Sequence, residues 1–268
     1  MTRASDLQTQ LTQERHRIHL IGVAGSGMSG IAALLLELGH DVRGSDKVRT
    51  QETQRLERLG LRFYLQHRAE DAHDAELVVY SSAIKKDNPI VAAASESGKQ
   101  LIRRAEALAA IMLGKRGIVV AGMHGKTTTS SMAAHVFREG GLHPSHYVGA
   151  EIPILGTNAH WNPRGEYFVA EGDESDGTLR FFHPEHALIL NIEEEHLDYY
   201  KDLDDIDRVF STLLEQTTGR VFYCADDFNA ARLCGKRDSA VAYGFVEHAD
   251  YRANGVQLQD FASVFRVL

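Results

Sequence analysis

The stretch over residues 118–139 constrains the fold most, because it reads as a strand, a glycine loop and a helix in immediate succession. Residues 118–121 are apolar and short, as expected of a buried strand. The loop Gly-Met-His-Gly-Lys-Thr-Thr follows at 122–128, and residues 130–139 continue as a predicted helix. A loop of this kind at a helix N-terminus is suited to bind phosphate. The strict form of the motif has glycine at position 120, where this chain has Val120.

The residue types in this loop indicate a nucleotide with a divalent cation. Glycines allow the backbone to turn its N–H groups inward. The lysine would place its charge on the β- and γ-phosphates, and the first threonine would offer its hydroxyl to Mg²⁺. The alternative is a glycine-rich turn before an ordinary helix, which Gly-Lys-Thr-Thr in this setting disfavours. We therefore predict ATP as a ligand, bound by Gly122, His124, Gly125, Lys126, Thr127 and Thr128.

A second glycine loop lies near the N-terminus, after a predicted strand over residues 17–23. Gly25, Gly27 and Gly30 match the pattern G-x-G-x-x-G, and Asp46 follows the next predicted strand about twenty residues on, as in dinucleotide-binding proteins. The physical requirements are a close backbone approach, a helix N-terminus and a carboxylate that can accept from a ribose or base. A nucleotide-sugar diphosphate meets these requirements as well as NAD does, so the motif leaves both open.

Acidic residues gather after two further apolar strands. Residues 167–170 end in Glu-Gly-Asp-Glu-Ser-Asp at 171–176, and residues 187–192 end in Glu-Glu-Glu-His-Leu-Asp at 193–198. Clustered carboxylates repel one another unless a positive charge is present, and hard oxygen ligands suit Mg²⁺. The alternatives are an exposed acidic loop and, for His196, an ordinary surface or packed histidine. Two such strand ends in one sheet favour a shared site.

Composition narrows the classes of partner. The 268 residues carry a net charge of −8, which argues against a nucleic-acid-binding or anionic-membrane surface. Two cysteines without a C-x-x-C pair favour neither a disulfide framework nor a cysteine zinc site. The polar N-terminus over residues 1–13 lacks the features of a signal peptide, and no apolar run is long enough to span a membrane. We therefore expect a cytoplasmic protein.

The remaining chain reads as further βα units. Helical patterns are predicted over 31–38, 50–59, 88–97, 103–113 and 204–216, and strands over 41–45, 76–80, 220–224 and 240–244. The last two segments, 251–258 and 262–268, alternate in character and predict a terminal β-hairpin. The short glycine-bounded stretch over 114–117 predicts a boundary between two domains.

Taken together, the motifs resemble those of the Mur ligase family. They occur in the order GSGMSGIA, Gly-Ser-Asp, Ser-Ser-Ala-Ile, Arg-Arg-Ala-Glu, AGMHGKTTT, EGDESD and NIEEEHLD, and the resemblance extends from Arg17 onward. It implies an N-terminal Rossmann-like parallel-sheet domain over 1–115, which binds a UDP-sugar in place of NAD. It also implies a P-loop ATPase-like central α/β domain over 116–268. The family's C-terminal, amino-acid-binding domain would be absent and the central domain incomplete.

The resemblance also assigns roles to residues. It implies catalytic roles for Lys126, Glu171 and His196, and metal contacts for Thr127, Glu171 and His196. Histidine is an unusual partner for Mg²⁺, so Glu171 is the firmer ligand. Contacts to the UDP-sugar are implied for the first glycine loop and for two residues near the uridine: Gly25, Ser26, Gly27, Met28, Ser29, Asp46 and Ser82.

The implied reaction is the ATP-dependent joining of L-alanine to UDP-N-acetylmuramate in peptidoglycan synthesis. The lactyl carboxylate would attack the γ-phosphate to give an acyl phosphate, which the amine of L-alanine then attacks. Catalysis in this class depends on closure of the third domain, so we expect these 268 residues to be inactive by themselves. A non-catalytic fragment that binds the UDP-sugar and ATP, and a sibling ligase that adds a whole tripeptide in cell-wall recycling, are the alternatives.

Overall fold

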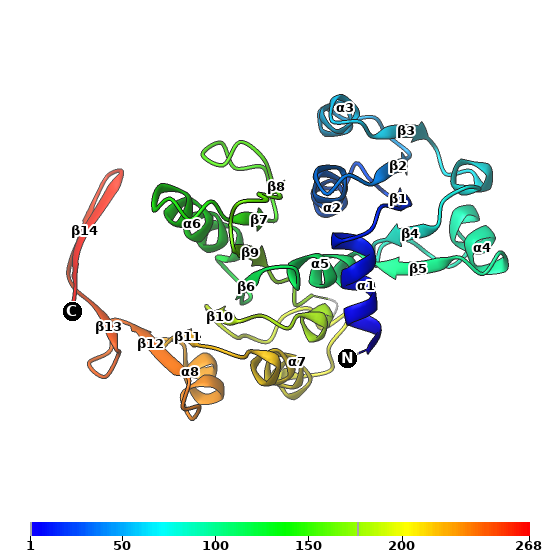
Figure 1. The fold of residues 1–268 in the computed structure, drawn as a ribbon. Helices are drawn as coiled ribbons and strands as arrows, with labels where there is room; N and C mark the ends of the chain where they lie inside the picture. The colour runs from blue at the N-terminus through cyan, green and yellow to red at the C-terminus, as the bar shows by residue number, and fades with distance from the viewer. Residues whose placement is uncertain (1, 176) are drawn as a thin grey trace. The chain divides into compact units, whose positions relative to one another are not determined.

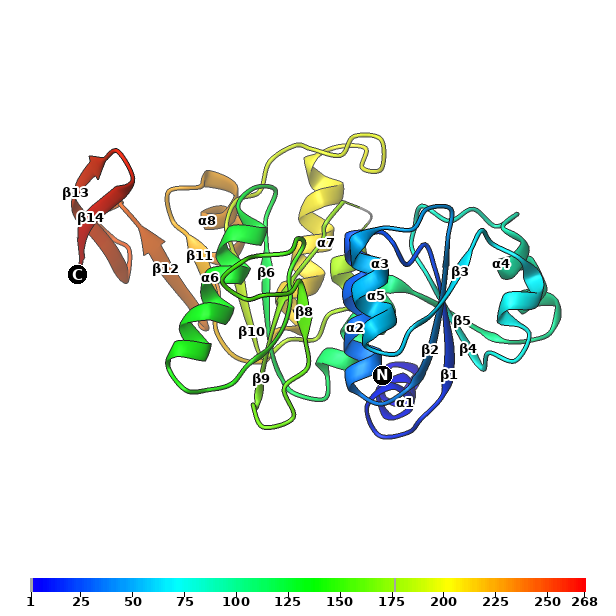
Figure 2. The same ribbon diagram turned by 90° about the horizontal axis from the view of Figure 1, so that it is seen from above.

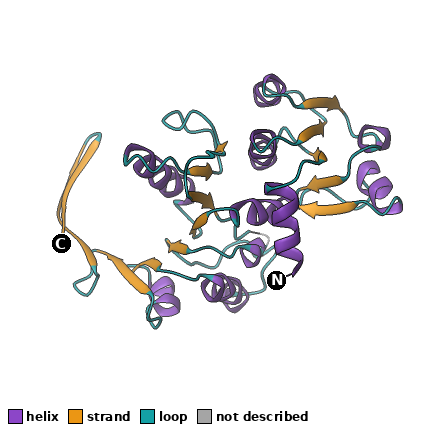
Figure 3. Cartoon of the chain, in the orientation of Figure 1, coloured by secondary structure: helices purple, strands orange, loops and turns teal. Residues whose placement is uncertain are grey.

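The computed structural model describes residues 2–175 and 177–268, so Asp176 of the predicted acidic cluster lies outside the described residues. Helices and strands alternate along most of the chain (Figure 1; Figure 3). The chain forms two compact units, one made of Met1–Arg116 with Ser131–Val169 and the other of Gly117–Ser130 with Ala170–Leu268. The division into domains 1–115 and 116–268 stays a prediction, because the chain returns to the first unit at Ser131.

The first unit is built on a parallel sheet of five strands in the order β3-β2-β1-β4-β5. The last four residues of its central strand, Ile18 to Ile21, are buried, as expected for a strand covered on both faces. This order is that of the predicted Rossmann-like sheet, so the predicted fold class is confirmed for this unit. The strands are β1 (Arg17–Ile21), β2 (Asp41–Asp46), β3 (Arg62–Leu65), β4 (Leu77–Tyr80) and β5 (Gln100–Arg103).

Helices cover both faces of this sheet. Helices α2, α3 and α5 lie on one face and α4 on the other, as two views at right angles show (Figure 1; Figure 2). Helix α3 begins with a capping box in which Thr50 and Thr53 satisfy each other's backbone N–H groups. The helices are α1 (Thr2–Thr12), α2 (Ser26–Glu37), α3 (Gln51–Arg58), α4 (Pro89–Glu96) and α5 (Arg104–Met112), with a short 3₁₀ turn, η1 (Ala69–Ala72).

Several elements of this unit were not expected from the sequence. The N-terminal segment is the helix α1, which contacts α5 and buries Leu7 and Leu11 in an otherwise polar sequence. Two short strands, β7 (Ser145–Tyr147) and β8 (Ala159–His160), form an antiparallel pair beside α2. Gly27 and Gly30 of α2 make room for Tyr147, because a Cβ at Gly30 would lie 2.8 Å from its ring.

The second unit contains a sheet whose strands run in the order β14-β13-β12-β11-β10-β6-β9. Four neighbouring pairs in this sheet are parallel: β6 with β10, β10 with β11, β11 with β12, and β12 with β13. The elements that lie wholly or partly in this unit are β6 (Arg116–Ala121), α6 (Lys126–Glu139), β9 (Tyr167–Glu171), η2 (Thr178–Phe181), β10 (His186–Ile189), α7 (Leu203–Gln216), β11 (Val221–Cys224), α8 (Phe228–Cys234), β12 (Ala240–Gly244), β13 (Tyr251–Gln259) and β14 (Ala262–Val267). Arg116 of β6, the part of α6 from Ser131 onward and the part of β9 up to Val169 belong to the first unit.

The core of this unit is formed by the apolar strands and the apolar face of α7. Val119, Val120, Ile189, Phe210 and Leu213 are fully buried. The predicted terminal hairpin is confirmed, since β13 and β14 pair antiparallel. Among the described residues, none of the helices has the length and apolar character that crossing a lipid bilayer requires.

Candidate functional site

The phosphate loop of the second unit lies between β6 and α6, where the sequence predicts it. Gly122 has a φ of 148° and Gly125 a φ of 80°, values that side chains rarely allow. A Cβ at Gly122 would also lie 3.0 Å from the Cβ of Leu190. The two glycines therefore let the loop turn tightly over the neighbouring strand into the N-terminus of α6.

Asn191 braces this loop. Strands β6 and β10 are neighbours with Ala121 opposite Ile189, so the residues that follow each strand meet at one edge of the sheet. The Oδ1 of Asn191 accepts a hydrogen bond from the backbone N–H of His124 at 2.8 Å, and its Nδ2 donates to the carbonyl of His124 at 3.1 Å. The side chain of His124 itself is exposed, as is Thr128 in the first turn of α6.

The ammonium of Lys126 is held at three points. Its Nζ donates to the carbonyl oxygens of Gly122 at 2.7 Å and Met123 at 3.0 Å, and to Oε1 of Glu174 at 2.7 Å. The Glu174 side chain is 1% exposed and that of Lys126 15% exposed. The phosphate-loop lysine thus has a buried counter-ion.

Glu174 is also in contact with His196. The Nε2 of His196 lies 3.4 Å from Oε1 of Glu174, and the hydroxyl of Tyr200 donates to the carbonyl of Glu174. Burial raises the pKa of the Glu174 carboxyl above its usual range, and the contact with Lys126 opposes this shift. The second oxygen, Oε2, is buried without a hydrogen-bond partner among the described groups. Glu174 therefore links the predicted catalytic residues Lys126 and His196.

Thr127 and Glu171 form a second contact beside the first. The hydroxyl of Thr127 donates to Oε1 of Glu171 at 3.1 Å. Glu171 ends β9, the strand next to β6, which brings it to the start of α6. Both groups offer oxygen, the ligand atom that Mg²⁺ prefers.

These oxygen donors decide whether the predicted metal fits the site. In the part of the chain that the structure describes, no three His, Cys, Asp or Glu side chains form a metal-binding group. Mg²⁺ is usually held by one or two carboxylates together with substrate phosphates, so a Thr127–Glu171 pair beside a phosphate loop fits it. His196 contributes a nitrogen and contacts Glu174, which makes it the weaker candidate for a metal ligand.

The glycine loop of the first unit leads from β1 into the N-terminus of α2. Gly25 is the N-cap residue and makes no side-chain cap, so the first N–H groups of α2 are available to an anion. Oδ2 of Asp46 accepts from the N–H of Ala24 at 2.9 Å, and Oδ1 accepts from that of Lys47 at 2.7 Å. Asp46, the carboxylate that the sequence predicts to accept from a ribose or base, therefore also fixes the conformation of the glycine loop.

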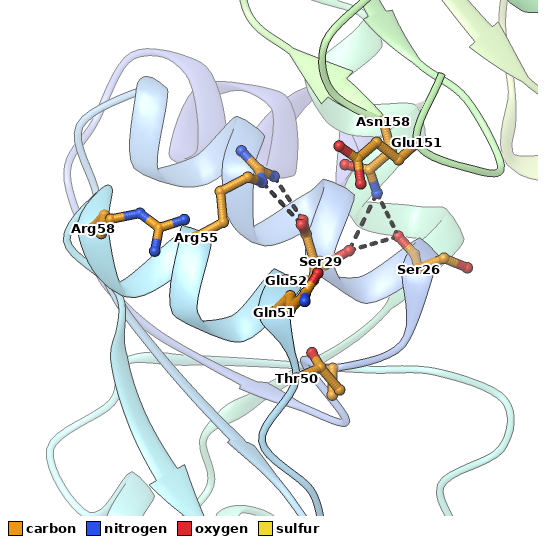
Figure 4. A pocket seen from close by; sticks show the side chains of 10 residues that line it. Ser26, Ser29, Thr50, Gln51, Glu52, Arg55, Arg58, Glu151 and Asn158 are labelled. Carbon is orange, nitrogen blue, oxygen red and sulfur yellow. Dashed lines mark hydrogen bonds and ion pairs between the residues drawn. The ribbon is translucent and has the colours of Figure 1, made fainter. Parts of the chain in front are cut away.

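A hollow of about 580 Å³ lies beside this loop (Figure 4). Ser26 and Ser29 line it, and Asn158 lies across from them, donating through Nδ2 to the Ser26 carbonyl at 2.8 Å and to Ser29 Oγ at 3.2 Å. Oδ1 of Asn158 is buried and has no partner among the described groups. Glu52 and Arg55 of α3 close another side through a paired contact. The side chain of Met28 is buried in the core.

A second hollow of the same unit, about 470 Å³ in volume, lies at the carboxyl ends of β2, β3 and β4. Lys47, His67 and Ile84 are among its lining residues. Ser82 is exposed in the turn that leads to Ala83 and Ile84 of this lining. Ligands bind at this end of the strands in open α/β sheets.

The structure thus brings some predicted residues together and adds others. Lys126 and His196 meet through Glu174, and Thr127 meets Glu171. The sequence analysis assigned no role to Asn191, Asn158 or His67, although Asn191 is the first residue of the motif NIEEEHLD. Glu174 is part of the predicted acidic cluster, but nothing in the sequence distinguishes it from its neighbours.

The fold and these loops define an α/β protein with two glycine loops, each of which leads from a strand into the N-terminus of a helix. The Mur ligase family catalytic-domain model matches residues 17–116, and the Mur ligase middle-domain model matches residues 120–268. The chain belongs to the Mur ligase family.

Among its relatives, the UDP-N-acetylmuramate–L-alanine ligase of Syntrophobacter fumaroxidans is 44% identical over 254 residues, covering 93% of this chain and 54% of the relative. A solved structure from Neisseria meningitidis is named UDP-N-acetylmuramate:L-alanyl-γ-D-glutamyl-meso-diaminopimelate ligase. It matches with a TM-score of 0.85 at 27% sequence identity, and the match covers 95% of this chain and 84% of the Neisseria chain. The UDP-N-acetylmuramate–alanine ligase of Thermotoga maritima matches with a TM-score of 0.83 at 27% sequence identity, and the match covers 94% of this chain and 57% of the Thermotoga chain. The chain spans about half the length of the curated relatives it matches.

Proposed function

We propose that this chain carries the UDP-sugar-binding and ATP-binding parts of an ATP-dependent amide ligase that joins L-alanine to UDP-N-acetylmuramate. The observation that carries the proposal is the phosphate loop, in which Lys126 and Thr127 stand beside the carboxylates of Glu174 and Glu171. The relative of 44% identity is named for this activity. A reaction that consumes ATP and a UDP-sugar requires a compartment that supplies both, so we propose the cytoplasm.

The proposed chemistry has two steps. A carboxylate oxygen of UDP-N-acetylmuramate bonds to the γ-phosphorus of ATP while the β,γ-bridging oxygen leaves with ADP. The amine nitrogen of L-alanine then attacks the acyl carbon, phosphate leaves, and the nitrogen loses a proton as the amide forms. No step needs a covalent bond to the protein.

In this scheme the protein's task is electrostatic. Lys126 stabilises the negative charge on the transferring phosphoryl group, which is the main catalytic contribution in such reactions. Thr127 and Glu171 would hold Mg²⁺, which when bound neutralises further phosphate charge. Asn191 keeps the loop in a shape that presents its N–H groups.

The amine partner is the finer part of the proposal. The solved Neisseria ligase is named for a tripeptide and the Thermotoga ligase for alanine, and both resemble this chain at 27% identity. The higher identity to the Syntrophobacter relative favours L-alanine. A tripeptide-adding ligase is therefore the second candidate.

Calorimetric titration tests the binding part of the proposal. UDP-N-acetylmuramate and ATP with Mg²⁺ should each bind at one site per chain, and NAD should not bind. Binding of NAD in place of the UDP-sugar would contradict the proposal and favour an oxidoreductase.

A chimera tests the reaction, since the chain spans about half of its relatives' length. The remaining C-terminal part of the Syntrophobacter relative would be joined after Leu268, and phosphate release measured with UDP-N-acetylmuramate and either L-alanine or the tripeptide. We expect release with L-alanine that is lost in Lys126→Ala. Release with the tripeptide alone would establish the second candidate.

A further inference from the structure

The segment that follows β10 connects the phosphate loop with the start of α8. Strand β10 lies between β6 and β11 in the sheet, so the residues after it lie between those that follow the other two strands. The N–H of Leu190 donates to the carbonyl of Ala121 at 2.9 Å, which continues the pairing with β6 past the end of β10. Asn191 and Ile192 come next, and each takes part in a pair of hydrogen bonds.

Asn191 pairs with the phosphate loop as a peptide group would. Its side-chain amide accepts from the N–H of His124 and donates to the carbonyl of the same residue. Its backbone carbonyl also accepts from the N–H of Met123 at 3.3 Å. Asn191 thus satisfies both backbone groups of His124 and fixes their orientation.

Ile192 is held in a similar way by the first residues of α8. Oδ1 of Asp227 accepts from the N–H of Ile192 at 3.3 Å, and Nδ2 of Asn229 donates to the Ile192 carbonyl at 2.8 Å. The same Asp227 oxygen caps α8 by accepting from the N–H of Ala230 at 2.7 Å. Ile192 is fully buried, so water cannot replace these partners. The start of α8 therefore sets the position of Ile192, and with it that of Asn191.

The phosphate loop is packed closely against this segment. A Cβ at Gly122 would lie 3.0 Å from the Cβ of Leu190 and 3.1 Å from the backbone nitrogen of Asn191. Interiors packed this closely transmit small shifts, so a displacement of residues 190–191 moves the loop as well. The N–H groups that face an anion at the start of α6 follow soon after His124 in the chain. Their direction therefore depends on how the His124 peptide is held.

We propose that Asn229 and Asp227 are positioning residues for ATP, which act on the phosphate loop through Ile192 and the side chain of Asn191. The inference rests on the proposed binding of ATP at this loop. A loop that is already held in its binding shape loses little conformational freedom when the ligand arrives, and this preorganisation increases affinity. In this account no atom of Asn229 touches the nucleotide.

A double-mutant cycle tests the connection, with ATP and Mg²⁺ titrated into the 268-residue chain by calorimetry. Asn191→Leu keeps the size of the side chain without its polar atoms and should weaken ATP binding about tenfold. Asn229→Ala should weaken it about three- to fivefold. The double variant should be within about twofold of Asn191→Leu, because Asn229 acts chiefly through Asn191. Losses that multiply would mean that the two residues act separately, and would overturn the inference.

Inorganic tripolyphosphate separates positioning from direct contact with the nucleoside. It offers the phosphates alone, so Asn229→Ala should weaken its binding by the same factor as that of ATP. A loss of ATP affinity that tripolyphosphate does not share would show that Asn229 meets the adenosine part, and the positioning role would be wrong.

Arg232→Ala is the matched control within α8. Nη2 of Arg232 donates to Oδ1 of Asn229 at 3.3 Å and to Asp207 at 2.6 Å, so this variant removes another partner of Asn229 and leaves its bond to Ile192 in place. ATP should bind Arg232→Ala as it binds wild type. A loss equal to that of Asn229→Ala would show a general effect of disturbing α8 and would contradict the inference. Circular dichroism melting verifies that each variant is folded.

The outcomes distinguish this inference from the proposed function. If folded Asn229→Ala binds ATP as tightly as wild type does, the inference is wrong although the ATP site stands. If wild type itself binds neither ATP nor tripolyphosphate, the proposed function fails.

Discussion

The ammonium of Lys126 lies 2.7 Å from a carboxylate oxygen of Glu174, a side chain that is 1% exposed. Because the pair is largely buried, removing one partner leaves a charge that water cannot solvate well. The same lysine is the residue expected to meet the phosphates of ATP. Glu174 thus sets both the stability of the phosphate loop and the position of its lysine.

Glu174→Ala should lower the free energy of unfolding by about 3 kcal/mol, the scale for breaking a buried pair. Urea denaturation measures it. Arg208→Ala removes the partner of Asp205 from a pair in α7 whose arginine is exposed, and should cost less than about 1 kcal/mol. A cost for Glu174→Ala no larger than that of Arg208→Ala would show that the Lys126–Glu174 contact does not hold the loop.

Two buried histidines should make the protein less stable in mild acid. Burial lowers the pKa of both His19 and His146 from 6.5 to about 4. Between these values the unfolded chain binds protons that the folded chain does not, so stability falls as the pH falls from 6.5 toward 4. Each histidine should contribute about 1.4 kcal/mol per pH unit within that window.

Urea denaturation at pH 6 and pH 5 measures this loss. His146→Gln keeps an amide that can donate to the Thr157 carbonyl, the partner of the His146 ring. It should remove the His146 share of the pH dependence. If the free energy of unfolding of this variant depended on pH as it does in wild type, His146 would not contribute to the pH dependence.

Gly30→Ala should destabilise the first unit by about 1–3 kcal/mol, because the new Cβ would lie 2.8 Å from the Tyr147 ring. Gly25→Ala is the matched control within the same motif. Gly25 has a φ of −72°, and a Cβ there would meet its nearest atom at 3.5 Å, so alanine should cost less than about 1 kcal/mol. An equal fall in the melting temperature of the two variants would contradict the packing role of Gly30.

Glu171→Ala should weaken ATP binding only when Mg²⁺ is present. The reason is that Glu171 and Thr127 supply the oxygen atoms that would hold the cation, while the phosphates themselves meet the loop and Lys126. Titration of ATP in Mg²⁺ and in EDTA separates these contributions. An equal loss of affinity in both buffers would remove the metal role from Glu171.

The elements that the sequence predicts well have a local physical signal. Strand, glycine loop and helix at 118–139 are recognisable because Gly122, Gly125 and Lys126 are neighbours in the chain. The terminal hairpin was predictable from alternation alone. Helix α1 was not, since Leu7 and Leu11 become core residues only through its contact with α5.

The site depends more on contacts between distant residues. Lys126 and Glu174 are 48 positions apart in the sequence, and His124 and Asn191 are 67 positions apart. No local sequence pattern can therefore predict either contact. The sequence alone predicts an acidic cluster without distinguishing its members. The pairing of the neighbouring strands β6 and β9 shows that Glu171 contacts Thr127 and that Glu174 contacts Lys126. Asp46 was predicted as a ligand-binding carboxylate, and the structure adds its bond to Ala24.

The central claim is that two separate loops bind two phosphorylated molecules, and Lys126→Ala tests it most directly. Calorimetric titration of this variant should show ATP binding weakened by about a hundredfold or more, since a charged partner of the phosphates is lost. UDP-N-acetylmuramate should bind as it does to wild type. If both affinities fell together in a folded variant, or if ATP bound unchanged, the account of two independent phosphate sites would be contradicted.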